Sequence, residues 1–149
     1  MFWIDVLSRI FHVTTAIMLL GGSLFTLLAY QPVLQTQPDQ VRRTISGQTR
    51  DSWRRWVHMG IAVFLVTGFY NYFRAMPLHK GDGLYHALIG MKIIIAMAVF
   101  FLASVLAGRS PRFENWRQAA AWPLKLLCLL GILIVAISGF LKVSSSNLQ

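Results

Sequence analysis

The chain has little cysteine and few acidic residues. Its one cysteine among 149 residues, Cys128, excludes an internal disulfide and a metal site built from several thiolates. Asp and Glu number five in all, and none lies in the middle of an apolar run. The sequence therefore offers little from which to build a hydrolytic site with paired carboxylates. A glycine-rich nucleotide-binding loop is also missing. The composition therefore directs attention away from hydrolases and nucleotide-dependent enzymes.

What the chain has in abundance is apolar sequence. Hydrophobic residues make up 56% and charged residues 13%, which is too apolar for an ordinary soluble domain. An apolar run of about 20 residues can cross a bilayer core of about 30 Å. We predict one integral membrane domain over residues 1–149, an all-α, four-helix transmembrane bundle with spans at about 4–30, 53–73, 84–108 and 122–143. We expect Pro32 to end the first helix and residues 31–52 to form an extramembrane loop, part of which could be a short surface helix.

Basic residues give the chain a net charge of +9, but they gather in short segments beside the apolar runs. That distribution is typical of topology signals and lipid contacts, and we do not expect a nucleic-acid partner. The side with the two longer loops carries nine of them, Arg42, Arg43, Arg50, Arg54, Arg55, Arg109, Arg112, Arg117 and Lys125, and the other side carries five, Arg9, Arg74, Lys80, Lys92 and Lys142. The excess predicts an integral protein of the bacterial inner membrane, with both termini outside.

Topology separates the histidines. His12 and His86 each lie early in a helix that starts on the outer side, so they can share a depth. His58 starts its helix from the opposite side and should lie about 20 Å away along the membrane normal. Helical spacing places His86 and Gly90 on one face of the third span, which we expect to contact protein. Similar stripes follow His12 to Gly22 in the first span and Phe64, Thr67 and Asn71 in the second.

Two histidines at matched depth, on helices with glycine nearby, suit a haem held between transmembrane helices. Haem iron takes imidazole nitrogens as axial ligands, and a flat macrocycle needs small residues where it meets a helix. We predict His12 and His86 as axial ligands, with Gly90 one turn after His86. No covalent attachment motif is present, so the group would be haem b. Basic residues near that depth could neutralise the propionates: Arg9, Arg74, Lys80 and Lys92.

Other interpretations stay open. A histidine near a helix end can be a simple hydrogen-bonding side chain, and Lys92 can extend its amine to the interface. Copper is a second candidate ligand, although the methionines lack a compact spacing. The tryptophans could also anchor a structural subunit that carries no cofactor.

Several short motifs resemble a known family. They are Phe11–His12–Val–Thr–Thr–Ala followed by Gly21–Gly22, Arg54–Arg55–Trp56, Thr67 to Tyr72 (TGFYNY) and Gly90 to Met97 (GMKIIIAM). The pattern is similar to the four-helix membrane proteins around the copper-resistance D domain and the haem J type of protoporphyrinogen oxidase. The resemblance implies a haem-linked role for His12, a functional Lys92 and a second-helix basic position at Arg54 or Arg55. It also implies either porphyrinogen oxidation or copper transport.

We therefore predict a b-type haem protein that takes part in electron transfer in the membrane. Its partners would be the lipid bilayer, other membrane redox subunits or quinone. Porphyrinogen oxidation, copper transport and a structural role are the alternatives, so whether the chain is an enzyme is left open.

Overall fold

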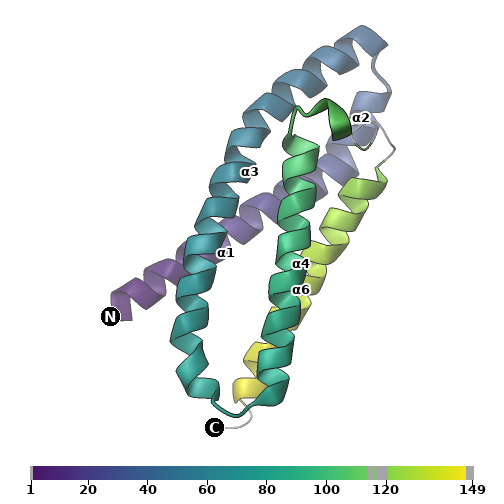
Figure 1. Ribbon diagram of the computed structural model, residues 1–149. Helices are drawn as coiled ribbons and strands as arrows, with labels where there is room; N and C mark the ends of the chain where they lie inside the picture. The colour runs from purple at the N-terminus through teal and green to yellow at the C-terminus, as the bar shows by residue number, and fades with distance from the viewer. Residues whose placement is uncertain (1, 114–115, 117–120, 147–149) are drawn as a thin grey trace.

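The computed structural model describes residues 2–113, 116 and 121–146, and within them every regular element is helical. The long helices are α1 (Phe2–Phe25), α3 (Asp39–Ala75), α4 (Gly83–Ala107) and α6 (Trp122–Ser146) (Figure 1). Shorter elements connect them: η1 (Thr26–Tyr30), α2 (Gln31–Gln35), η2 (Met76–His79) and η3 (Pro111–Phe113). The predicted all-α class is confirmed.

Three helical segments are long and apolar enough to cross a membrane: Phe2–Gln35, Gly83–Ala107 and Trp122–Ser144. They correspond to the predicted first, third and fourth spans, and they support an integral membrane protein. The predicted span 53–73 lies within α3, which is less apolar because it also carries His58 and Asn71. The structure therefore gives three candidate spans and one further long helix.

The predicted loop at residues 31–52 is wrong for most of its length, because α3 begins at Asp39 and continues without a break to Ala75. A helix of 37 residues is about 55 Å long, well beyond a bilayer core of about 30 Å. The blue end of α3 extends past the other helices in Figure 1. Residues 39–52 are polar but contain no proline, and the helix continues through Gly47.

Pro32 does not end the first helix as predicted. The backbone widens into a π-helical turn over Thr26–Tyr30, where the Gln31 N–H bonds to the carbonyl of Thr26. Pro32 then occupies the first turn of α2, a position that needs no N–H donor. The wider turn thereby lets the helical path continue to Gln35.

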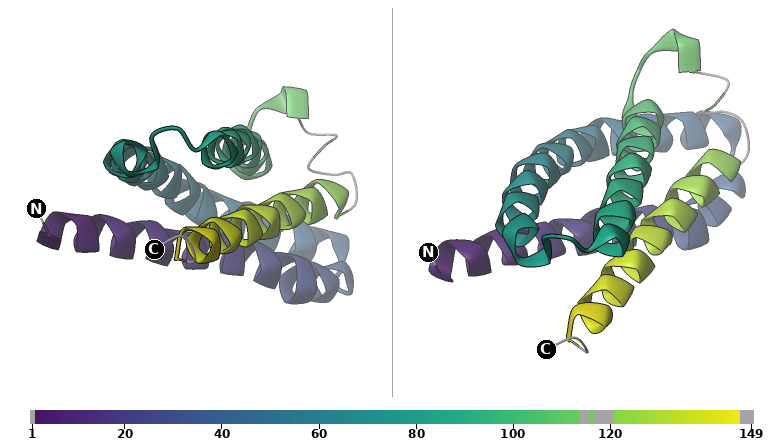
Figure 2. Two further views of the ribbon diagram at one scale, coloured as in Figure 1. Left: turned by 90° about the horizontal axis from the view of Figure 1, so that it is seen from below. Right: turned by 60° about the horizontal axis from the view of Figure 1, so that its bottom comes forward.

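The four long helices form two layers, α3 with α4 and α1 with α6 (Figure 2). α1 and α3 pack antiparallel in a constant register. Along α1, Asp5, Ser8 and His12 bond to Arg74, Asn71 and Thr67 of α3. This ladder of polar contacts fixes which residues of α3 face His12.

Tight packing gathers at the end where α4 finishes and α6 begins. The buried apolar side chains there are Leu102, Val105, Leu124, Leu127 and Cys128. Close contacts at glycine extend the packing along α1, because Gly22 lies against the Trp53 ring and Gly60 lies against Leu19. The rest of the space between the layers is open.

Candidate functional site

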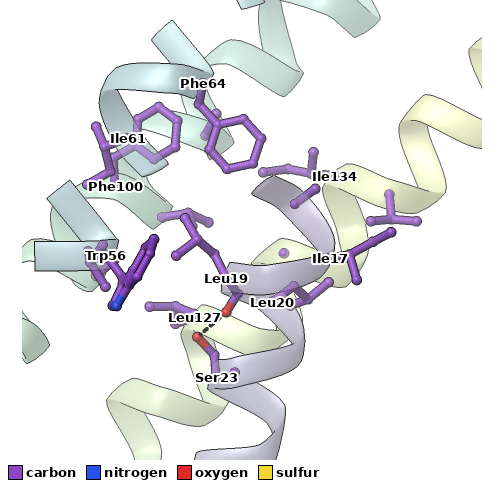
Figure 3. A pocket seen from close by; sticks show the side chains of 18 of the residues that line it. Ile17, Leu19, Leu20, Ser23, Trp56, Ile61, Phe64, Phe100, Leu127 and Ile134 are labelled. Carbon is purple, nitrogen blue, oxygen red and sulfur yellow. Dashed lines mark hydrogen bonds between the residues drawn. The ribbon is translucent and has the colours of Figure 1, made fainter. Parts of the chain in front are cut away.

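A cavity of about 2350 Å³ runs between the two layers and is lined by all four long helices. Its walls are mainly apolar, with Leu19, Ile61, Phe64, Phe100 and Leu127 among the side chains shown in Figure 3. Ligand pockets usually measure about 300–1,000 Å³. The cavity can therefore hold a ligand larger than an ordinary metabolite.

His12 enters this cavity from α1 and is oriented by α3. Its Nδ1 lies 2.8 Å from the Thr67 Oγ1, and the Thr67 hydroxyl donates to the Val63 carbonyl at 2.6 Å. A hydroxyl has one proton, and that proton goes to Val63, so Thr67 must accept from His12 Nδ1–H. This fixes the tautomer and leaves the lone pair on His12 Nε2, the form in which imidazole binds a metal.

Aromatic side chains surround the histidine. The Phe64 ring meets the His12 ring edge to face, with centroids 4.8 Å apart, and Phe100 of α4 lies 5.8 Å beyond Phe64. Gly68, one turn along α3, lies beside the imidazole, since a Cβ built there would be 3.8 Å from His12 Cε1. On the α3 side, the His12 ring is therefore in contact with Phe64, and Gly68 leaves room beside the imidazole.

The cavity wall is strongly cationic. Among the described residues that line it are seven basic residues and one carboxylate, Asp5; the basic residues are Arg9, Arg42, Arg43, Arg50, Arg74, Lys92 and Lys142. Lys92 of α4 is half-buried and lines the same cavity as His12. Within the described part of the chain, Lys92 and Arg9 have no hydrogen bond or ion pair. Both can therefore receive an anionic group of a ligand.

Arg74 differs from these two cations because a carboxylate already pairs with it. Its Nε and Nη2 donate to the two Asp5 oxygens at 3.0 and 2.9 Å, and Tyr70 donates to the same carboxylate at 2.7 Å. This network joins the start of α1 to the end of α3. Arg74, which was predicted to neutralise a propionate, lines the cavity, but its charge is balanced by Asp5.

His86 and Gly90 lie on α4 but are not part of the cavity lining. His86 is exposed, and its ring contacts Tyr85 with centroids 5.8 Å apart. The cavity face of α4 is formed at this level by Tyr85, Ile89 and Lys92. Of the six predicted cofactor residues, the structure brings together Arg9, His12, Arg74 and Lys92 and leaves His86 and Gly90 outside.

The other basic and histidine side chains lie away from His12. His58 is exposed, and its Nδ1 donates to the Arg54 carbonyl one turn earlier. Lys80 is exposed in the turn after η2. Neither they nor Arg54 and Arg55 line the cavity.

Sequence reasoning did not assign a partner to His12. The sequence places Phe64, Thr67 and Asn71 on one face of their helix. Helical spacing does not show which residues of another helix that face contacts. The contact depends on the α1–α3 register, which Asp5 and Arg74 help to set. A search for complementary polar pairs along two antiparallel helices could have found it.

Within the described residues, no three His, Cys, Asp or Glu side chains gather in a way that could hold a metal ion. A copper site made from those residue types therefore has no support in this part of the chain. Comparison with protein-family models, curated proteins and solved structures finds no match to this chain. The family resemblance of its short motifs stays a prediction.

Proposed function

We propose that this chain is an integral membrane protein that binds haem b between its helices and takes part in electron transfer. The observation that carries the proposal is the orientation of His12, whose Nδ1–H is bonded to Thr67 so that Nε2 keeps its lone pair. A second group that fixes the ring of a ligating histidine is the usual arrangement in metal proteins.

The cavity suits a large, flat, apolar group that carries acidic substituents. Its volume of about 2350 Å³ exceeds an ordinary ligand pocket. Phe64 and Phe100 supply apolar aromatic surface near His12. Arg9 and Lys92 supply cations that can pair with carboxylates.

Each residue has a distinct task in this proposal. His12 Nε2 would hold the haem iron, and Thr67 holds the imidazole in the tautomer that this requires. Lys92 and Arg9 would pair with the propionate groups, whereas Arg74 remains with Asp5 and ties α1 to α3. When bound, haem b would supply one-electron redox chemistry.

The test compares the haem content of three histidine variants after purification from a haem-replete host. We expect the wild type, His86→Ala and His58→Ala to retain haem and His12→Ala to lose most of it. Retention of full haem by His12→Ala would overturn the assignment of the ligand. Loss of haem in His86→Ala as well would instead support the pairing of His12 with His86 predicted from the sequence.

Oxidation of a porphyrinogen is a second candidate, favoured by the volume of the cavity. Its size allows a second tetrapyrrole-sized ligand, and its unpaired cations suit a substrate with several carboxylates. Expression of the chain in a strain that lacks protoporphyrinogen oxidase distinguishes the two. Growth of this strain would support the enzyme. Failure of the strain to grow, although the expressed protein contains haem, would favour electron transfer alone.

A further inference from the structure

The end of the cavity remote from His12 and Lys92 has a chemistry of its own. Arg43, Ser46, Thr49 and Arg50 of α3 and Tyr30 of η1 line it there, and we call these five residues the arginine mouth. Arg43 and Arg50 are seven residues apart, so they lie on nearly the same face of α3 and about 10 Å apart along its axis. Two long arginine side chains at that spacing can converge on one anionic group between them.

The cations of the arginine mouth are available for a ligand. Within the described residues, Arg43 and Arg50 have no ion pair, whereas the neighbouring Arg42 is held by Asp39 at 2.6 Å. Of the lining residues that the structure describes, the one carboxylate is Asp5, which lies at the opposite end beside Arg74. Neither arginine is therefore neutralised from within the cavity.

A hydrogen-bond donor accompanies the two arginines. The Tyr30 hydroxyl donates to Thr49 Oγ1 at 3.0 Å, and a hydroxyl that accepts such a bond still has a proton of its own to donate. Tyr30 ends the π-helical turn of Thr26–Tyr30, and such turns often occur at functional sites. The irregular backbone that accommodates Pro32 also contributes a side chain to this mouth.

Beyond the mouth the cavity becomes apolar, with Trp53, Leu106, Leu124 and Leu127 in its walls. Cations at the opening of an apolar chamber match an amphiphile that has an anionic head and a hydrocarbon tail. We propose that the arginine mouth binds the phosphate of an anionic phospholipid, whose acyl chain enters the apolar chamber. This site is independent of the proposed haem, because His12 lies at the other end of the cavity.

The test measures which lipid the purified full-length chain retains. The protein is equilibrated in micelles with equal amounts of phosphatidylglycerol and phosphatidylcholine that have the same acyl chains, then washed, and bound lipid is counted by mass spectrometry. We expect preferential retention of phosphatidylglycerol by the wild type. Arg43→Gln with Arg50→Gln should reduce that preference about thirtyfold, the effect of two basic contacts at a membrane surface.

A matched control removes two charges that do not line the cavity, Arg112→Gln with Lys125→Gln, and should keep the preference. Arg43→Lys with Arg50→Lys should keep most of the preference, which separates the effect of charge from an effect on folding.

Equal retention of the two lipids by the wild type, or an unchanged preference in the Arg43→Gln, Arg50→Gln protein, would overturn the proposal. Displacement of the lipid by millimolar inorganic phosphate would show a site for free phosphate and would also overturn it. Haem content should be the same in all these proteins, so this test is separate from that of His12.

Discussion

At the scale of single residues, Thr67 determines which nitrogen of His12 is available. Thr67→Val keeps the shape of the side chain but removes the oxygen that accepts the Nδ1 proton. Because a partner of this kind typically affects metal affinity by about 10- to 100-fold, we expect haem affinity to fall by that factor. Titration of haem into the apoprotein measures the change.

Thr67→Ser restores the hydroxyl and should restore haem affinity. Thr14→Val is the control, because Thr14 is an exposed residue of α1, two residues from His12 and outside the cavity lining. If Thr67→Val binds haem as tightly as the wild type, Thr67 does not position the ligand.

A second residue-scale prediction concerns the ion pair of Asp51 and Arg109, which joins α3 to the segment after α4. Arg109 Nε donates to Asp51 at 2.9 Å, and this guanidinium holds the pKa of the carboxyl below its usual range. A lowered pKa in the folded state stabilises the fold above the ordinary aspartate pKa of about 3.9, and the contribution disappears as the pH falls through the lowered value.

We therefore expect the Tm of Arg109→Gln to fall slightly at neutral pH and to match that of the wild type once the pH is low enough to protonate Asp51 in both. The effect is small, because both side chains are largely exposed. Thermal unfolding in detergent across this pH range measures it, with Arg112→Gln as the control. An equal Tm difference at every pH would show that Arg109 acts by something other than this pair.

At the scale of elements, the contact of α1 with α3 depends on a glycine. A Cβ built at Gly22 would lie 2.8 Å from Cζ2 of the rigid Trp53 ring, whereas one at the neighbouring Gly21 would meet nothing within 4 Å. Gly22→Ala should therefore lower the free energy of unfolding by about 1–3 kcal/mol, the usual cost of overpacking. Gly21→Ala should leave stability unchanged or raise it slightly, because alanine favours helix.

Denaturant unfolding of the two variants side by side gives the comparison. Equal stabilities would mean that the two helices do not approach closely at Gly22. A larger loss in Gly21→Ala would place that residue in the contact instead.

The element boundaries show where sequence reasoning succeeds. The third and fourth spans were predicted within a few residues, because each is an uninterrupted apolar run bounded by turn residues. The errors at Pro32 and at residues 39–52 have different causes. At Pro32, the preceding π turn lets the helical path continue although proline has no N–H to donate. At residues 39–52, a polar segment can be helical without the apolar periodicity by which a span is recognised.

At the scale of the whole molecule, the structure brings some of the predicted site residues together and leaves others apart. Arg9, His12, Arg74 and Lys92 do line one cavity, since residues at similar depth on neighbouring helices tend to meet. His86 lies outside the cavity. Its predicted depth in the membrane does not determine how α4 is rotated about its own axis. It follows Tyr85 by one residue, about 100° around α4, and Tyr85 is the one that faces the cavity.

The chain direction through the membrane is also testable at this scale. The charge distribution predicts both termini outside, with the turn before α3 in the cytoplasm. After Cys128→Ala, a cysteine at Asp82 should react with an impermeant thiol reagent in intact cells, and one at Gln37 should react only after lysis. The reverse pattern would invert the topology.

The visible spectrum of the purified wild-type protein tests the central claim most directly. A reduced-minus-oxidised difference spectrum should show the absorption bands of a b-type haem, at close to one haem or more per chain. A flat difference spectrum from protein made in a haem-replete host, with the helical content intact, would contradict the account.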